Sequence, residues 1–281
     1  MALSKNSVEG DIAYIDSKSL TAEHLVYPVS SGKKIVRPPN SYQKMVISDG
    51  RETIDSFDID IQGFSLINHK SRVSDFYDNE VVKRQYYPEI IELLKTQLNA
   101  TDVLVFDHNQ RSKVRASAKQ AEVRNPVAAA HVDYTLSSAP KRSIEILEKA
   151  NKTHYIGRRL ALINAWRPII GPAQDFPLAL CDVRSVKVND LVQTDIHHFG
   201  ESDPNMPRHS GQIYSLRHSL SHKWYYFSDM QPDEVLLLRN WDSTAADKKI
   251  GYTPHTGFKN NLAPEDTRPR ESIEIRTLVV Y

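Results

Sequence analysis

The second half of the chain is a rapid succession of short, strand-like segments, and this pattern limits the possible folds more than any other feature. Proline, aspartate, asparagine, serine or glycine residues separate each segment from the next. The segments are "RLALINAWRPI", "LALCDVRSVKV", "GQIYSLRHS", "KWYYFSD", "EVLLLRNWD" and "ESIEIRTLVVY". Many short strands separated by turn residues are typical of an antiparallel β-sandwich or barrel.

The first half adds helices, so the predicted fold class is α+β. Apolar residues recur at helical spacing from 74 to 98, and Pro88 marks a break or a new helix start. The stretch "SSAPKRSIEILEKA" predicts another helix, with Ser137 or Ser138 as its cap and Pro140 in its first turn. The stretch "TDVLVFDH" predicts a buried strand, and "FDIDIQGFSLI" predicts a hairpin that turns at Gly63.

Domain organisation follows from the absence of a recognisable linker, so residues 1–281 are predicted to form a single domain. Residues 1–40 are mixed in composition and end in "SGKKIVRPPN". This composition indicates an N-terminal arm that lies on the domain and is not a core element.

Charge and composition exclude several classes of function. Thirty-six basic and thirty-five acidic residues give a net charge of +1, which offers no electrostatic basis for nucleic-acid binding. The single cysteine, Cys181, cannot form an intrachain disulfide. The N-terminus lacks the apolar core of a signal peptide, and no window reaches the roughly 18 apolar residues of a membrane span. We therefore expect a cytoplasmic protein, a monomer or a homodimer, that acts on a small molecule without nucleic-acid or membrane partners.

The stretch "AAAHVDYT" contains the first candidate metal ligands, His131 and Asp133. Side chains two residues apart in an extended segment point to the same face, so this imidazole and this carboxylate can converge on one point. His255 in "GYTPHTGF" could supply the third ligand from a strand edge. Two imidazoles and one carboxylate form the facial triad of non-haem iron(II) oxygenases, which leaves positions open for an oxo acid and dioxygen. Zinc would accept the same ligands but has no redox chemistry.

The last predicted strand carries a second group of polar residues at alternate positions: Arg270, Ser272, Glu274 and Arg276. All four share one face in an extended strand. An inward arginine there could bind the distant carboxylate of a dicarboxylic acid in bidentate fashion, with help from a serine hydroxyl. The alternative is a surface strand with an ion pair between Glu274 and Arg276.

Several other histidines have simpler interpretations. Asp195, His197 and His198 in "DIHHF" indicate a loop or surface position, with a substrate lid as the alternative. His222 is interpreted as a packing residue, and His108 as a structural histidine whose alternative is to orient a neighbouring group.

At this point a family resemblance becomes specific, because several motifs occur in a fixed order. They are "DIQGFSLINHKSRVSDFYD", "YYPEIIELLK", "VFDHNQR", "HVDYT", "INAWRPI", "PLALCDVRSV", "HKWYYFSDMQPDEVLLLRNWDS", "PHTGF" and "PRESIEIR". Over roughly residues 40–281 the chain resembles the fungal and bacterial hydroxylase/desaturase family. Its members include gibberellin desaturase-like proteins, the aspergillic-acid hydroxylase type and a cephalosporin methoxylation component.

The resemblance implies an iron(II)- and 2-oxoglutarate-dependent dioxygenase with a double-stranded β-helix (jelly-roll) core, flanking helices and an N-terminal extension. Such an enzyme uses dioxygen to hydroxylate, desaturate or cyclise a small specialised metabolite, for example an amino-acid-derived one, at an unactivated C–H bond. Two alternatives stay open. One is an iron oxygenase that does not use 2-oxoglutarate, and the other is a non-catalytic accessory subunit of an oxygenase.

The resemblance also implies roles for individual residues. It makes His131, Asp133 and His255 the iron ligands. It makes an arginine of "PRESIEIR" the 2-oxoglutarate clamp, with Arg270 and its partner Ser272 preferred over Arg276. It places Trp166 and Arg167 near the co-substrate or substrate, and Asn164, on the same strand face as Trp166, could add a polar contact.

Overall fold

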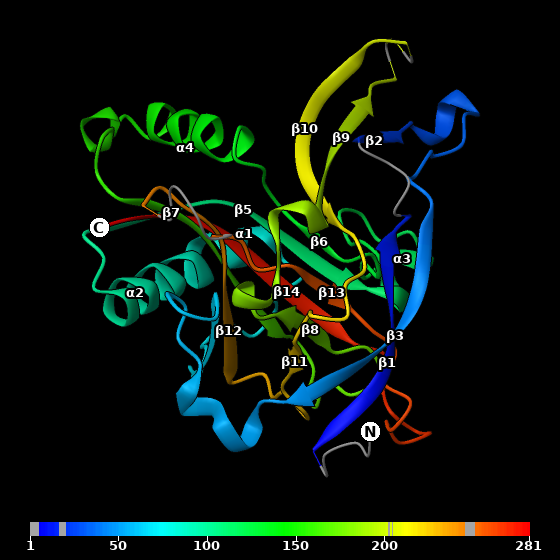
Figure 1. Ribbon diagram of the computed structural model, residues 1–281. Coiled ribbons are helices and arrows are strands. Elements are labelled where there is room, and N and C mark those ends of the chain that lie inside the picture. The colour runs from blue at the N-terminus through cyan, green and yellow to red at the C-terminus, as the bar shows by residue number, and fades with distance from the viewer. Residues whose placement is uncertain (1–5, 17–20, 202, 204, 245–250) are drawn as a thin grey trace.

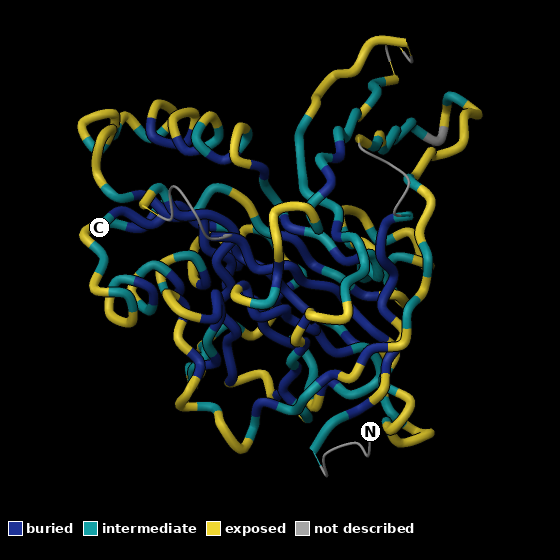
Figure 2. The backbone as a smooth tube through the Cα atoms, viewed as in Figure 1, coloured by how far each residue is buried: buried dark blue, intermediate teal, exposed yellow. Residues whose placement is uncertain are grey.

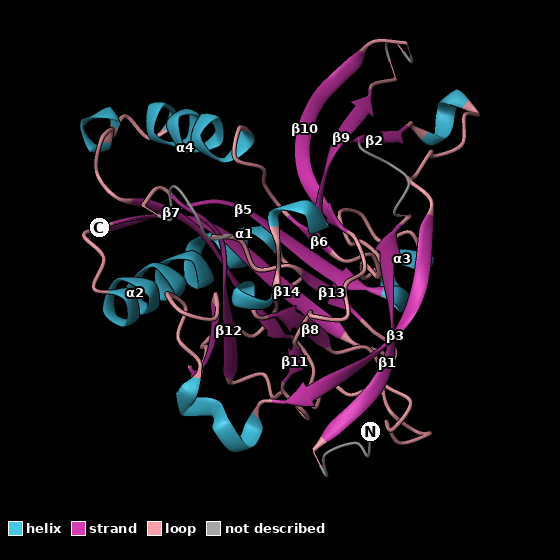
Figure 3. Cartoon of the chain, in the orientation of Figure 1, coloured by secondary structure: helices cyan, strands magenta, loops and turns pink. Residues whose placement is uncertain are grey.

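The computed structural model describes residues 6–16, 21–201, 203, 205–244 and 251–281, and in this part of the chain two curled β-sheets face each other (Figures 1 and 3). The larger sheet has nine strands in the order β1 (Ser7–Ile15), β3 (Asn40–Asp49), β11 (Trp224–Tyr226), β8 (Leu178–Cys181), β13 (His255–Gly257), β6 (His131–Val132), β10 (Pro207–Leu216), β9 (Leu191–Phe199) and β2 (Thr21–Val26). The smaller has five in the order β4 (Phe64–Asn68), β12 (Glu234–Asp242), β7 (Leu160–Pro168), β14 (Glu271–Val280) and β5 (Asp102–Ser112). All pairings are antiparallel except β3–β11 and β2–β9.

Apolar side chains at alternate positions of the strands fill the space between the two sheets. Leu162 of β7 and Leu278 of β14 belong to the same buried cluster as Ile12 of β1 and Ile47 of β3. This buried layer occupies the centre of the molecule in Figure 2, whereas the tips of the strands and loops are exposed. The arrangement is the expected jelly-roll, in which the inner faces of two sheets cover each other.

Helices cover the sandwich in two places. Three consecutive helical elements pack on the outer face of the five-stranded sheet. They are α1 (Asn79–Val81), the π-helix Val82–Tyr86 and α2 (Tyr87–Leu98). Ile90 and Leu94 of α2 join a buried cluster with Ile163 and Ile275 of the sheet. Pro88 lies at the start of α2, as predicted, because proline is tolerated in the first turn.

The second place is one end of the sandwich, where α4 (Ser138–Lys149) buries Ala139, Ile146 and Leu147 against the inner core. Ser137 occupies the N-cap position of α4, but its side chain makes no capping hydrogen bond. The remaining helical elements are α3 (Lys113–Ser117) and 3-10 turns at Val29–Ser31, Arg51–Ser56, Thr153–Tyr155, Val183–Ser185 and Val188–Asp190. None of the helices in the described part of the chain has the length and apolar character that crossing a bilayer requires.

All six strand-like segments of the second half form strands, and "TDVLVFDH" becomes the longer strand β5. Two expectations are wrong. The prediction that residues 1–40 lie outside the core fails for β1, whose Ile12 and Tyr14 are fully buried because β1 pairs along its whole length with β3. The expected hairpin around Gly63 is also wrong, because residues 57–62 form turns and only Phe64–Asn68 is a strand, which pairs with β12 instead.

Candidate metal centre and its two cavities

His131, Asp133 and His255 meet at the inner face of the nine-stranded sheet. His131 of β6 and His255 of β13 are direct partners across an antiparallel pair, and their ring centroids lie 4.5 Å apart. Asp133 follows β6 by one residue, and its Oδ1 lies 3.5 Å from Nε2 of His131 and 4.0 Å from Nε2 of His255. One ligand atom from each side chain therefore lies within 4.8 Å of the others, a spacing that can hold a single metal ion.

Hydrogen bonds to the backbone fix the orientation of both imidazoles. Nδ1 of His131 lies 2.8 Å from the carbonyl oxygen of Ala129, and Nδ1 of His255 lies 3.0 Å from that of Thr253. A carbonyl oxygen only accepts, so each Nδ1 carries the proton and donates it. Each Nε2 is left with a lone pair aimed at the centre of the triad, which is the state that a metal ligand requires.

The electrostatic surroundings keep Asp133 ionised. Burial by itself would raise the pKa of this carboxyl, but Arg276 and then the two histidines lower the pKa well below its usual range. Burial, followed by the nearby His131, lowers the pKa of His255, which favours the neutral imidazole. The triad thus presents one anion and two neutral nitrogen donors, the donor set of the 2-His-1-carboxylate facial site.

One side of the triad opens into a small inner pocket between the two sheets. Its lining residues come from the triad, from β5, β7 and β14, and from the segments around β8 and β13: Arg111, Val127, His131, Asp133, Trp166, Leu178, His255, Thr256, Gly257, Arg270, Glu274 and Arg276. The space that remains open is about 30 Å³. Three arginines thus face this pocket, so it is suited to an anion.

Arg270 is a cation of the inner pocket that makes no ion pair within the described residues. It precedes β14 directly, donates from Nη1 to the Phe176 carbonyl at 2.8 Å, and lies 5.5 Å from the Trp166 ring. Burial and the nearby Arg111 lower the pKa of Arg270 to about 9. Nε of Arg270 and Oγ of Ser272 are buried and have no hydrogen-bond partner among the described residues. Burying a charge and leaving two donors without acceptors both destabilise the fold. A bound carboxylate would accept hydrogen bonds from both donors and neutralise the charge.

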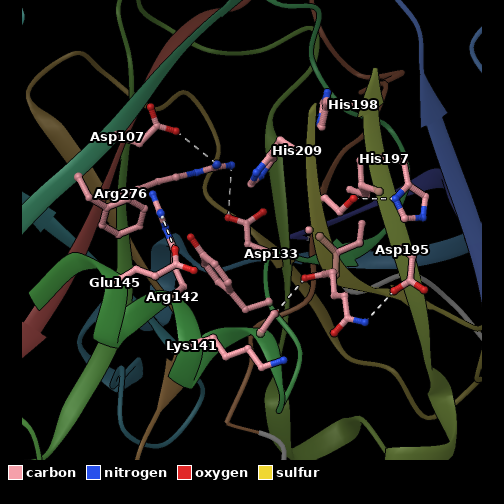
Figure 4. A pocket seen from close by; sticks show the side chains of 18 residues that line it. Asp107, Asp133, Lys141, Arg142, Glu145, Asp195, His197, His198, His209 and Arg276 are labelled. Carbon is pink, nitrogen blue, oxygen red and sulfur yellow. Dashed lines mark hydrogen bonds and ion pairs between the residues drawn. The ribbon is translucent and has the colours of Figure 1, made fainter. Parts of the chain in front are cut away.

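Arg276 has a different environment, because carboxylates surround it. Its guanidinium lies 3.6 Å from Asp133 and 3.6 Å from Asp107 (Figure 4). Its Nε donates to Glu274 at 3.1 Å. Burial would lower the pKa of Arg276, but Asp133 and then Glu274 raise it. The alternative of a Glu274–Arg276 ion pair is thus correct, although the pair is buried beside the triad and not on the surface.

The other side of the triad opens into a large cavity of about 580 Å³. Its walls are α4 (Ser138, Lys141, Arg142 and Glu145), β9 (residues 195–198) and β10 (residues 209–213), and its floor holds Phe106, Asp107, Asp133, Tyr134 and Arg276. Figure 1 shows β9 and β10 rising from the sandwich opposite α4, and Figure 4 shows the cavity between them. The volume lies in the range of small-molecule sites. Asp133 and Arg276 line both the large cavity and the inner pocket.

The predicted residues of β7 divide between the two faces of the five-stranded sheet. Asn164 points inward and donates from Nδ2 to Oδ2 of Asp133 at 2.8 Å, and Trp166 lines the inner pocket. Arg167 points to the opposite face, where it lies over the Tyr86 ring and contacts His69. The placement of Arg167 near the co-substrate is therefore wrong, because successive strand residues face opposite ways and Trp166 already faces inward.

Sequence reasoning missed several residues of this site. His197 and His198, interpreted as surface residues, lie on β9 and line the large cavity, as does His209 on β10. Asp107 lies in the segment "TDVLVFDH", which was predicted to be a buried strand, and Arg111 follows it by a few residues. Arg111 stands between Gln110 and Ser112, so no alternation with apolar residues shows which face of the strand it occupies.

Comparisons with known proteins agree with this geometry. Residues 12–280 match a family model described as an oxidoreductase/YMDC permease-like domain. The hydroxylase/desaturase efuI of Hormonema carpetanum is 34% identical over 261 residues, which cover 85% of this chain and 84% of that protein. The Fe(II)/2-oxoglutarate-dependent dioxygenase nvfI of Aspergillus novofumigatus is 26% identical over 292 residues, which cover 99% of each chain. A solved structure of the iron and alpha-ketoglutarate-dependent endoperoxidase NvfI superimposes with a TM-score of 0.84 at 25% identity, covering 100% of this chain and 99% of that one.

Proposed function

The chain belongs to the hydroxylase/desaturase family of iron(II)- and 2-oxoglutarate-dependent oxygenases, and we propose that His131, Asp133 and His255 hold its ferrous ion. The observation that carries this proposal is the convergence of their three ligand atoms within 4.8 Å at the junction of two cavities. Both Nε2 lone pairs and the ionised carboxylate suit a divalent cation. Ferrous iron held there would activate dioxygen, the oxidant that breaks an unactivated C–H bond, while 2-oxoglutarate would supply the other two electrons.

We propose the inner pocket as the place of 2-oxoglutarate, with Arg270 and Ser272 binding its distant carboxylate. The support is the pair of unsatisfied donors, Arg270 Nε and Ser272 Oγ. Arg276 is less suitable, because it already has three carboxylate neighbours. An open space of about 30 Å³ holds only about two waters, so binding of the keto acid requires side chains of the pocket to move aside.

The large cavity is the proposed place of the organic substrate. It reaches the triad at Asp133 and has the size of a small-metabolite site, about 580 Å³. Apolar contacts come from Phe106, Tyr134 and Ile213, and polar contacts from the imidazoles of β9 and β10. The chain's part in the reaction is to hold one C–H bond of a small specialised metabolite towards the triad and to keep bulk water away from it.

The test is anaerobic reconstitution with iron(II), followed by measurement of bound iron and of succinate released from 2-oxoglutarate over a panel of amino acids and small acids. His131→Ala should abolish succinate formation and lower the iron content. The exposed His154 of the turn Thr153–Tyr155 offers a matched control, so His154→Ala should keep both.

Three results would contradict the proposal. Iron binding with product but no succinate would favour an oxygenase that does not use 2-oxoglutarate. A chain that binds no iron would favour the accessory subunit. Unchanged iron content in His131→Ala would remove His131 from the site.

We also propose a cytoplasmic location, a monomeric or homodimeric state and no nucleic-acid partner. The near-neutral charge of +1 supports the last point, since nucleic-acid binding usually depends on a basic surface. Size-exclusion chromatography with light scattering would determine the oligomeric state.

A further inference from the structure

The two oxygens of the Asp133 carboxylate face different partners. Oδ1 faces the Nε2 atoms of His131 and His255, whereas Oδ2 accepts from Asn164 Nδ2 at 2.8 Å and lies 3.6 Å from Arg276 Nη2. We propose that Asn164 and Arg276 are positioning residues that hold Oδ2 away from the metal, so that Asp133 coordinates through Oδ1 alone. This inference rests on the proposed function, because it concerns the same metal site.

The fold brings the hydrogen-bond donor Asn164 and the cation Arg276 to the same oxygen. Asn164 of β7 and Arg276 of β14 are direct partners in the antiparallel pair, and both side chains point into the space between the sheets. β7 and β14 are interior strands of the five-stranded sheet, flanked by β12 and β5. The two side chains therefore extend from interior strands of that sheet, whereas Asp133 stands in a bend after the two-residue strand β6. The five-stranded sheet thus supplies both partners of the carboxylate oxygen that faces away from the histidines.

The consequence concerns the number of coordination positions. Carboxylates bind metals through one or both oxygens, and a second bound oxygen would occupy another position. Three protein ligands on one face leave room for two atoms of the keto acid and one of dioxygen. If Asp133 bound through both oxygens, one of these positions would be lost. A hydrogen bond from Asn164 and the charge of Arg276 make the one-oxygen mode the favoured one.

Arg276 is itself held in place on the side away from Asp133. Glu274 accepts from its Nε at 3.1 Å, and Asp107 lies 3.6 Å from Nη1. Removing this guanidinium would leave buried carboxylates without a counter-ion, which destabilises proteins in general. Asn164 is neutral, so its replacement gives the cleaner test.

The experiment compares the wild-type chain with Asn164→Leu, which keeps the approximate volume but removes the donor. Anaerobic titration with iron(II) should show an affinity about 10- to 100-fold weaker in the variant, the usual effect of removing a group that orients a metal ligand. The visible absorption spectrum of the cobalt(II)-substituted protein should also change, because it reports the number and geometry of the ligands. Gln110→Leu is the matched control: it removes a buried amide from the outer face of the same sheet, where Gln110 binds Asn79, and should leave both readouts unchanged.

A second measurement separates positioning from a general structural role. In an Asp133→Ala background, Asn164 has no carboxylate to orient, so Asn164→Leu should no longer weaken metal binding. Nickel(II) is suitable for these weaker sites because it binds nitrogen and oxygen ligands more tightly than iron(II). The same loss of affinity in both backgrounds would overturn the inference.

Other outcomes are equally decisive. If the wild-type chain binds no iron(II), the proposed function fails. If it binds iron(II) and Asn164→Leu has the wild-type affinity and cobalt spectrum, the positioning role alone fails. Should Asn164→Leu not fold, Asn164→Ala removes the same donor with a smaller side chain. Its unchanged affinity and spectrum would also overturn the inference.

Discussion

Arg270 and Arg276 lie six residues apart and both face the inner pocket, yet they are suited to different tasks. Arg276 is neutralised by Asp133, Asp107 and Glu274, so an additional anion gains little from it. Arg270 has a carbonyl partner and two aromatic neighbours, Trp166 and Phe176, but makes no ion pair within the described residues. A cation in such surroundings binds an incoming carboxylate strongly, because the competing solvent has already been removed.

Arg270→Ala should therefore raise the concentration of 2-oxoglutarate needed for half-maximal succinate formation, by about 10- to 100-fold. This range corresponds to the loss of hydrogen bonds to a charged group. Iron(II) affinity in the absence of the keto acid should stay close to that of the wild type, because Arg270 contacts none of the three ligands. If only Arg276→Ala raises the 2-oxoglutarate requirement, the assignment to Arg270 is wrong.

The sequence was sufficient to predict pairs of site residues that lie close together along the chain. His131 and Asp133 are two residues apart, and Arg270 and Ser272 likewise, so strand geometry alone places each pair on one face. Nothing local indicated that Asn164 would reach Asp133, because this contact depends on how β7 approaches the end of β6 across the sandwich. Arg111 was missed for the same reason, since its role depends on the facing sheet.

At the scale of elements, the segment before β4 shows how a tertiary contact decides a local structure. The alternation in "FDIDIQGFSLI" suits a hairpin, but Gly63 has a φ of +94° and its carbonyl accepts from Thr253 and from Arg239. These two acceptor contacts connect residues far apart in sequence. The chain therefore turns at Gly63, but β4 pairs with β12 and not with the residues that precede it.

Gly63→Ala should consequently destabilise the fold by more than Gly157→Ala. Both glycines have a φ of +94°, so the backbone strain from an added side chain is the same, about 1–3 kcal/mol. A Cβ at Gly63 would lie 2.3 Å from Thr253 Oγ1 and 2.7 Å from Val183, whereas a Cβ at Gly157 would meet nothing within 4 Å. The clash should add about 1–3 kcal/mol at Gly63 alone. Equal urea midpoints for the two variants would show that Thr253 and Val183 move aside without lowering the free energy of unfolding.

At the scale of the whole molecule, the sequence predicted the kind of architecture but not which strands pair with one another. Six strands of the second half were recognisable from composition and turn residues. The strands that escaped include β1, β2, β3 and β9. β1 pairs with β3, and β9 lies between β10 and β2, so each depends on partners distant in sequence. The direct pairing of His131 with His255 could not be derived either, since the order β8, β13, β6, β10 is a property of the closed sheet.

Ion pairs at both ends of β12 connect this strand to distant parts of the chain, and they make stability depend on pH. Glu234 pairs with Arg51, and Asp242 pairs with Arg159. Burial would raise the pKa of each carboxyl, but the hydrogen bond from the arginine lowers the pKa below its usual value in both. Because the folded-state pKa is the lower one, each pair stabilises the fold above the usual carboxyl pKa. The contribution is lost as the pH falls through the folded-state value.

We therefore expect the free energy of unfolding to fall gradually from pH 7 to about pH 5, because burial lowers the pKa of histidines such as His255 and His222, and to fall more steeply below about pH 4. Asp242→Asn removes one titrating carboxyl and leaves Arg159 without its buried partner, so the variant should be less stable than the wild type at pH 7. The difference between the two should shrink as the pH falls, because the wild-type Asp242 then becomes protonated and loses its ion pair as well. Urea unfolding at pH 7, 5, 4 and 3 measures this difference. A gap that stays constant over the whole range would mean that the charge of Asp242 does not account for its contribution to stability.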